Sequence, residues 1–185
     1  WVYSVPTTLS AITMPAEMTI VAGFPQTIPA TYSPNVIRWT WSPGTGLSCG
    51  NCPTPDAGPR FDTRYQVYVR DDNGCANIGA ILVRVICQNS NLFIPNTFSP
   101  NNDGSNDVFY PRGRGLERVK TLRIFNRWGE VVFEKRDFPV NDPNQGWNGR
   151  YKGQAPKADV YVYQAEVYCD NGQIIKLNGN IALIL

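Results

Sequence analysis

The amino-acid sequence predicts an all-β protein made of two Ig-like β-sandwich domains in series. Short runs rich in Val, Ile, Tyr and Thr recur along the 185 residues, and Gly, Pro and Asn separate them. No stretch repeats its apolar residues with the 3.6-residue period of a helix. The spacing of the runs is typical of a sandwich of Ig size, and the chain is long enough for two.

The first sandwich is predicted over residues 17–88. Its strands are expected at residues 36–41, 63–71 and 80–87. In the middle run, Tyr65, Val67 and Val69 alternate with residues of another kind, as in a strand with one buried face. The Asn-Gly pair at 73–74 then predicts a tight hairpin turn into the next strand.

The second sandwich is predicted over residues 92–185, after the polar tract 87–91. Its strands are expected at residues 119–126, 130–135, 160–168 and 173–185. Tight links at 126–129 and 170–172 join them in pairs. The opening residues, 1–16, are expected to be the last strand of a preceding unit and a linker.

Composition excludes several classes of function. The formal net charge is +2, and neither half of the chain has the basic excess of a nucleic-acid binder. No run approaches the roughly 18 apolar residues of a membrane-spanning helix. The chain has no histidine, which excludes Ser-His and Cys-His nucleophile pairs and His-containing zinc sites. Most acidic residues adjoin Gly, Asn or Pro, where turn formation explains them, so no enzyme is predicted.

Five cysteines in a β-rich chain favour an oxidising compartment. The disulfide candidates lie in the first unit and are Cys49, Cys52, Cys75 and Cys87. Cys169 stands alone in the second unit. A CxxC redox pair needs a helix start beside a βαβ unit, and a four-cysteine zinc site needs a second close pair; neither is present in the sequence. One or two structural disulfides are therefore expected, and the sequence leaves their connectivity open.

The segment 93–109, "FIPNTFSPNNDGSNDVF", has two interpretations. In the first, side-chain oxygens at alternate positions could converge on one calcium ion, from Asn101, Asp103, Ser105 and Asp107. Gly104 would allow the sharp turn, but Ser99 and Tyr110 occupy the slots where an EF-hand has Asp and Glu. In the second, the Asn and Asp side chains form a series of turns by bonding their own backbone.

Four ordered motifs in the second half carry a family resemblance: "IPNTFSPNNDGSNDVF", "LRIFNRWGEVVFE", "GWNGRYKGQ" and "DVYVYQAEV". They resemble the gliding-motility-associated C-terminal domain, the type B sorting domain of type IX secretion substrates in Bacteroidota. The similarity covers about residues 92–185. The opening motif of the family matches Pro95, Asn96, Phe98, Pro100, Asn101, Asp103, Gly104, Asn106, Asp107 and Phe109. The next two motifs match Ile124, Asn126, Arg127, Trp128, Gly129, Trp147 and Gly149.

The sequence departs from the family pattern at three places. Asn102 stands where the family usually has Gly, and Asn148 where it usually has Asp. The final "IALIL" lacks the basic residue often found near the family's end. Upstream, "WTWSPGTGLSCGNCPTP" and "YQVYVRDDNGC" resemble the PKD- or Ig-like modules that often precede this domain in large surface adhesins. Such modules act mainly as spacers.

The resemblance implies a C-terminal secretion and cell-surface retention signal. The expected location is the outer-membrane cell surface, reached through the periplasm. The expected partners are the type IX translocon and a PorP/SprF-type outer-membrane β-barrel protein, with no nucleic acid among them. The resemblance requires no cofactor, and Ca²⁺ is the one candidate.

The candidate partner-binding residues are Arg127, Trp128, Trp147, Tyr151, Ile181, Leu183, Ile184 and Leu185. Exposed aromatic residues dominate interface energetics, but Trp147 could instead pack under its own loop. The last strand could offer its edge or tip to a partner, or be buried and paired. Basic residues gather between 112 and 127, either as a solvated face or as a surface for acidic groups. An alternative function is a carbohydrate-binding module in which Trp128, Trp147 and Tyr151 stack on sugar rings.

Overall fold

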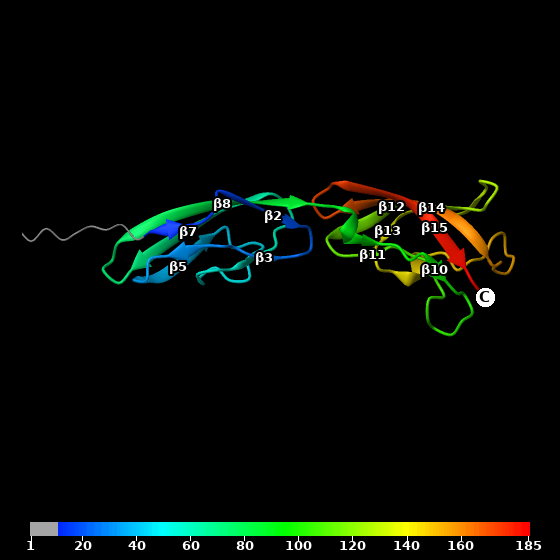
Figure 1. Ribbon diagram of the computed structural model, residues 1–185, viewed down its shortest axis with the longest axis horizontal. Helices are drawn as coiled ribbons and strands as arrows, with labels where there is room; N and C mark the ends of the chain where they lie inside the picture. Colours follow the sequence, from blue (N-terminus) through cyan, green and yellow to red (C-terminus); the bar gives the residue numbers. More distant parts are fainter. Residues whose placement is uncertain (1–10) are drawn as a thin grey trace, which may run out of the picture. The chain divides into compact units, whose positions relative to one another are not determined.

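A computed structural model describes residues 11–185 as two compact units, the first ending at Ile86 and the second spanning Cys87–Leu185 (Figure 1). Strands build both units, and no α-helix occurs among the described residues. The predicted all-β class is therefore confirmed.

Residues 11–86 of the first unit contain eight strands. They are β1 (Ile12–Thr13), β2 (Glu17–Val21), β3 (Gln26–Thr27), β4 (Thr31–Tyr32), β5 (Val36–Ser42), β6 (Asp56–Ala57), β7 (Thr63–Asp71) and β8 (Ala76–Ile86). Four of them form a sheet in the order β2-β8-β7-β5, and two small pairs, β1-β4 and β3-β6, complete the unit. Buried and exposed side chains alternate along β7. This is the pattern of a strand that packs one face against the core.

The start of the described chain differs from the expected linker. Residues 1–10 lie outside the described residues. Ile12 and Thr13 pair with Tyr32 and Thr31, and Met14 packs against the core of the first unit. Residues 11–16 are therefore built into the first unit.

The second unit contains seven strands and two short 3₁₀ turns. They are the turn η1 (Asn89–Asn91), β9 (Leu92–Phe93), β10 (Thr97–Phe98), β11 (Arg112–Gly113), β12 (Leu116–Phe125), β13 (Val131–Pro139), the turn η2 (Pro143–Gln145), β14 (Asp159–Cys169) and β15 (Ile174–Leu183). The main sheet has the order β10-β15-β14-β12-β13, in which only β10 runs parallel to its neighbour. A two-stranded pair, β9-β11, lies apart from it.

The core of the second unit lies on one face of the five-stranded sheet. Inward side chains of β12, β14 and β15 pack there against side chains from the connecting segments, among them Leu92, Phe109 and Trp147. Loop residues thus form much of the layer that faces the sheet. The opposite face of the sheet, called the outer face below, carries the alternate side chains of the same strands.

The cysteines pair differently from the expectation that confined the disulfides to the first unit. Cys49 bonds Cys52, in the loop between β5 and β6, but Cys87 bonds Cys169 within the second unit. Cys75 is in no disulfide among the described residues. Cys75 and Cys87 flank the two ends of β8, roughly 40 Å apart in an extended strand, whereas a disulfide needs Cα atoms within about 7 Å.

Candidate functional site

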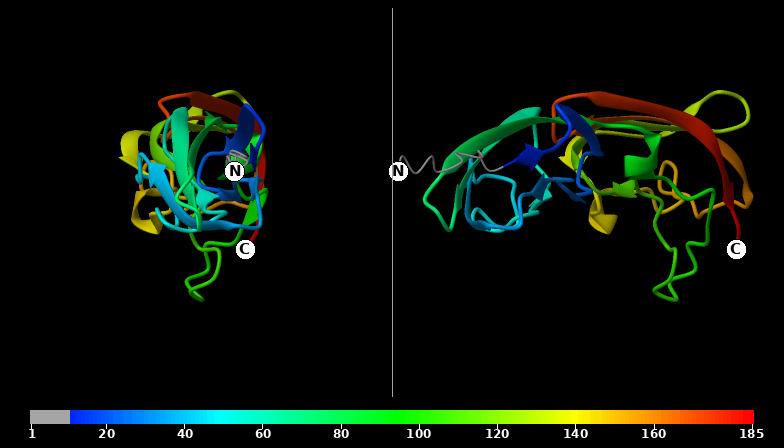
Figure 2. Two further views of the ribbon diagram at one scale, coloured as in Figure 1. Left: turned by 90° about the vertical axis from the view of Figure 1, so that its left-hand side faces the viewer. Right: turned by 60° about the vertical axis from the view of Figure 1, so that its left-hand side comes forward.

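The family motifs meet at one end of the five-stranded sheet. Phe125 pairs with both Val131 and Val162, and Asp159 pairs with Leu183. The turn 126–129, the start of β14 and the end of β15 therefore lie at the same end. The segment entering the loop 99–108 runs beside the end of β15 (Figures 1 and 2). We call this region, with the loop 140–158 and residues 184–185, the motif end.

An aromatic cluster forms the interior of the motif end. Trp147 is 1% exposed and packs edge-on against Tyr161, with ring centroids 4.8 Å apart. Its ring also lies 5.3 Å from that of Phe98, and its indole N–H donates to the carbonyl of Arg150 at 3.0 Å. Trp147 therefore holds its own loop to the sheet, which is the alternative that the sequence left open, and its ring is not exposed to a partner in this fold.

Gly149 joins the opening motif, the third motif and the last strand. Its φ of +79° is in the left-handed region that favours glycine. A Cβ at this position would lie 2.9 Å from Cδ1 of Leu183, 3.0 Å from Cβ of Pro156 and 3.1 Å from Cγ of Pro100. Any residue with a Cβ would therefore force its neighbours to move. The glycine of this motif thus has a packing role.

Hydrogen bonds inside the loop 99–108 hold its shape. The carboxylate of Asp107 accepts from the backbone N of Asn102 at 2.6 Å and of Gly104 at 2.9 Å. The carboxylate of Asp103 accepts from the backbone N of Ser105 at 2.7 Å and from the side-chain amide of Asn101 at 3.0 Å. These bonds, that of Ser105 foremost, lower the pKa of the Asp103 carboxyl. The loop therefore has the geometry of consecutive Asx turns.

The four residues considered as calcium ligands are Asn101, Asp103, Ser105 and Asp107. The carboxylate oxygens of Asp103 and Asp107 accept from N–H donors of the loop itself, so a calcium ion here would have to replace those donors. Across residues 11–185, no three His, Cys, Asp or Glu side chains are grouped as metal ligands.

The turn 126–129 presents Trp128 to solvent. The side-chain oxygen of Asn126 accepts from the backbone N of Trp128 and of Glu130, both at 3.0 Å, which fixes the turn. Trp128 is 77% exposed, and the guanidinium of Arg127 lies 5.7 Å from its ring centroid. Arg127 also binds the carboxylate of Asp159 through two nitrogens, and this pairing lowers the pKa of Asp159.

A hollow of about 170 Å³ lies between Trp128 and the long loop. Its lining consists of Asn126, Trp128, Val132, Trp147, Gly149, Tyr151, Gln154, Ala155, Lys157, Asp159 and Tyr161. The hydroxyl of Tyr151 donates to the carboxylate of Glu130 at 2.5 Å, which Lys152 also approaches at 3.3 Å. The structure thus brings the three predicted aromatic residues together, with Trp147 buried beneath the other two.

The last strand divides the predicted apolar residues into two groups. Ile181 and Leu183 are buried because they occupy inward positions of β15, so they cannot contact a partner in this fold. Ile184 and Leu185 follow the strand and are exposed, Leu185 by 74%. The candidate contacts on this segment therefore reduce to the final two residues.

Sequence reasoning missed three exposed valines of the motif end. Val160 and Val162 lie on the outer face of β14, and Val131 begins β13. With Trp128, Ile184 and Leu185 they form the set that we call the apolar rim. The signal was present in "VYVY", because the positions that alternate with the buried tyrosines are apolar where a solvated face would be polar.

Comparison with known proteins gives one family match. The CHU_C type IX secretion signal domain matches residues 92–183. No curated protein matches the chain. No helix among the described residues is long and apolar enough to span a membrane.

The similar solved structures are distant. The titin domains Z1Z2 in complex with telethonin are 10% identical, with 95% of each chain covered and a TM-score of 0.35. The Bacteroides ovatus mixed-linkage glucan protein SGBP-B is 11% identical over 95% of this chain and 47% of its own, with a TM-score of 0.36. Latent PorU from Porphyromonas gingivalis is 11% identical over 82% of this chain and 16% of its own, with a TM-score of 0.32. None of these carries a functional conclusion.

The match covers the whole of the main sheet of the second unit and all four motifs. Through residues 92–183, the chain belongs to the CHU_C type IX secretion signal domain family.

Proposed function

We propose that the second unit is a C-terminal signal that sends a large, adhesin-like surface protein through the type IX translocon and retains it on the outer-membrane cell surface. The observation that carries the proposal is that four motifs, far apart in the sequence, build a single end of one sheet. A signal of this kind makes and breaks no bond, so it needs no catalytic group. The preceding unit serves as a spacer.

Recognition takes place at the apolar rim. Large apolar side chains that are exposed at one end of a sheet suit a surface that a partner covers. Trp128 supplies the aromatic anchor that interface hot spots favour, and Arg127 braces it through Asp159. The partner is a PorP/SprF-type outer-membrane β-barrel protein, which binds the rim after export.

A second candidate function is glycan binding at the same end. The exposed ring of Trp128 lies beside a hollow with polar groups from Asn126, Gln154 and Lys157. An aromatic face next to such hydrogen-bonding groups suits a sugar ring. Under this alternative, loss of Trp128 abolishes glycan binding but leaves surface display intact.

The test is a fluorescent reporter with an export leader and residues 87–185 at its C-terminus, in a Bacteroidota host. The fusion begins at Cys87 because the disulfide to Cys169 requires it. Surface fluorescence is expected to depend on the PorP/SprF-type partner and to fall in Trp128→Ala and in a variant lacking Ile184 and Leu185. Phe93→Ala is the matched control, since Phe93 is exposed in β9, outside the motif end.

The outcomes separate the parts of the proposal. A folded reporter that stays in the periplasm contradicts the sorting role. Partner-dependent display that is unaffected by the Trp128 and C-terminal variants keeps the sorting role and removes the apolar rim as its recognition surface.

A further inference from the structure

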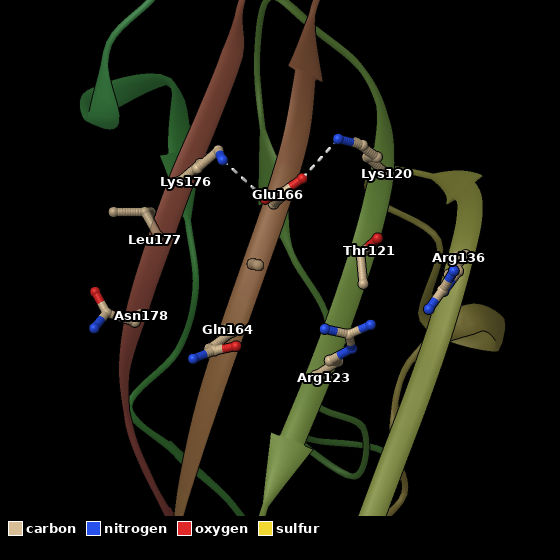
Figure 3. Close-up of a pocket in the computed structure, with 10 residues that line it drawn as sticks. Lys120, Thr121, Arg123, Arg136, Gln164, Glu166, Lys176, Leu177 and Asn178 are labelled. Carbon is tan, nitrogen blue, oxygen red and sulfur yellow. Dashed lines mark ion pairs between the residues drawn. The ribbon is translucent and has the colours of Figure 1, made fainter. Parts of the chain in front are cut away.

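Two rows of polar side chains cross the outer face of the five-stranded sheet (Figure 3). Strand register places Lys176, Glu166, Thr121 and Arg136 in one row, on β15, β14, β12 and β13. The same register places Asn178, Gln164, Arg123 and Glu134 in the next. Lys120, at the bulge of β12, adds a further cation to the first row. We call this surface the polar rows.

Each glutamate of the polar rows lies between two cations. Glu166 pairs with Lys120 at 2.8 Å and with Lys176 at 3.2 Å, so lysines from both neighbouring strands reach toward it (Figure 3). These pairs, that of Lys120 foremost, lower the pKa of the Glu166 carboxyl. Glu166 is therefore ionised at neutral pH.

The second glutamate repeats the arrangement. Glu134 pairs with Arg136 at 2.6 Å and with Arg123 at 3.2 Å. Four cations thus surround two anions, which leaves a net charge of +2 on the surface.

The polar rows enclose a hollow with spare hydrogen-bond donors. Its volume is about 410 Å³, within the range of roughly 300–1,000 Å³ that is usual for ligand sites. A lysine has three N–H donors and an arginine five, so the ion pairs use only part of their capacity. Gln164, Asn178 and Thr121 add amide and hydroxyl groups to the lining.

We propose that the polar rows bind an extended acidic segment of a partner protein, with carboxylates placed beside the two cation pairs. The two glutamates are two strands apart and offset by two residues along the sheet. Strand spacing of about 4.8 Å and a rise of about 3.3 Å per residue put the two sites roughly 12 Å apart. Acidic residues four positions apart in an extended chain have nearly this separation.

Three features favour a carboxylate-bearing polypeptide over a phosphate-rich membrane. Glu134 and Glu166 repel a densely charged anionic membrane more strongly than they repel a peptide whose carboxylates are spaced apart. The amides of Gln164 and Asn178 can bond a peptide backbone. β13 is the last strand of the sheet, and no other strand of residues 11–185 pairs with its free edge, so an extended segment can continue along it.

The test measures fluorescence anisotropy of a labelled peptide with the whole 185-residue chain at low salt. The peptide consists of Ser and Thr with glutamates four positions apart, and a control peptide of equal composition has them adjacent. The spaced peptide is expected to bind more tightly, and added salt to weaken it.

Removing cations and removing anions from the polar rows should change the affinity for the spaced peptide in opposite directions. The double variant Lys120→Gln with Arg123→Gln is expected to weaken binding by about three- to tenfold, because it removes one cation beside each glutamate at an exposed site. Glu134→Gln with Glu166→Gln is expected to strengthen binding by a similar factor, a gain that unfolding cannot produce. The double variant Arg64→Gln with Arg70→Gln, at exposed positions of β7 in the first unit, is the matched control.

Three results overturn the proposal. The first is equal affinity for the two peptides, and the second is an unchanged peptide affinity in both double variants. The third is tighter binding to phosphatidylglycerol vesicles than to the spaced peptide. The last would identify a lipid surface as the ligand. The proposed sorting role does not depend on this result, because the reporter assay reads the apolar rim.

Discussion

Phe109 and Trp147 exchange two backbone hydrogen bonds, from N of Phe109 to O of Trp147 at 2.8 Å and from N of Trp147 to O of Phe109 at 2.9 Å. This pair joins the opening motif to the third motif. Gly146 allows the approach, because a Cβ there would lie 2.6 Å from the carbonyl oxygen of Phe109. Much of the family signature therefore specifies how two long loops close on the sheet.

Replacing the buried tryptophan should cost far more stability than replacing the exposed one. Trp147→Ala removes a buried ring from the aromatic cluster, for which the expected loss in free energy of unfolding is about 3–5 kcal/mol. Trp128→Ala should stay within about 0.5 kcal/mol of the parent protein. Urea unfolding followed by circular dichroism measures both. Equal losses would show that Trp147 does not hold the loops.

Gly149 and Gly153 have nearly the same φ, so comparing them distinguishes the cost of a left-handed backbone from the cost of close packing. Gly149 and Gly153 have φ values of +79° and +77°, but only Gly149 has neighbours within 4 Å of an added Cβ. Gly153→Ala should cost about 1–2 kcal/mol from the left-handed backbone alone. Gly149→Ala should cost a further 1–3 kcal/mol, roughly, because Leu183 and Pro100 must move. Matching losses in thermal unfolding would contradict the packing role of Gly149.

The disulfide between Cys87 and Cys169 should dominate the stability of the second unit. It closes a loop with a sequence separation of 82, for which chain entropy gives about 4.5 kcal/mol. Cys87→Ala with Cys169→Ala should lower the free energy of unfolding by about this amount. Cys75→Ala, outside any disulfide, is the control. Mass spectrometry of the unreduced digest checks the connectivity, and a Cys75 cross-link would contradict it.

The ion pair of Arg127 and Asp159 should be lost in acid. Because Arg127 lowers the pKa of the Asp159 carboxyl in the folded state, its contribution to stability is present above the unfolded pKa of about 4. That contribution disappears as the pH falls through the folded value. The melting temperature of Asp159→Asn should therefore lie below that of the parent protein at neutral pH and converge with it in acid. A difference that is independent of pH would rule out the ion pair as its cause.

Calcium should leave the stability of the second unit unchanged. The carboxylate oxygens of Asp103 and Asp107 already accept N–H bonds within the loop. Asp107→Ala should cost roughly 1 kcal/mol by removing two of these bonds. Thermal unfolding with and without Ca²⁺ tests the point. A rise in melting temperature with Ca²⁺ that Asp107→Ala abolishes would show that the loop binds the ion.

The sequence predicts the long strands well but not the features that depend on register. β7 has the predicted bounds because its alternation is regular over its whole length. β12 begins at Leu116, earlier than expected, because a bulge between Val119 and Thr121 breaks the alternation there. Very short strands such as β10 have too few residues for a period and are defined only by their partners.

The sequence predicts the turns of the candidate site, but not which side chains lie together on a face of the sheet. The turn chemistry of Asn126 and Asp107 is local and can be read from residue type. The polar rows combine side chains from four strands, so they exist only once the strand register is known. The disulfide of Cys87 was missed because its partner lies beyond the polar tract that was taken as the boundary between units.

The covalent loop closed by Cys87 and Cys169 also determines how the second unit bears mechanical tension. A pull between residue 87 and residue 185 passes through the disulfide directly to Cys169, so residues 88–168 lie outside the force path. The load then falls on β15, which is held by its ladder with β14 and its short pairing with β10. Stretching the oxidised unit can therefore detach this one strand while the remainder stays folded, and reduction would let the whole unit extend.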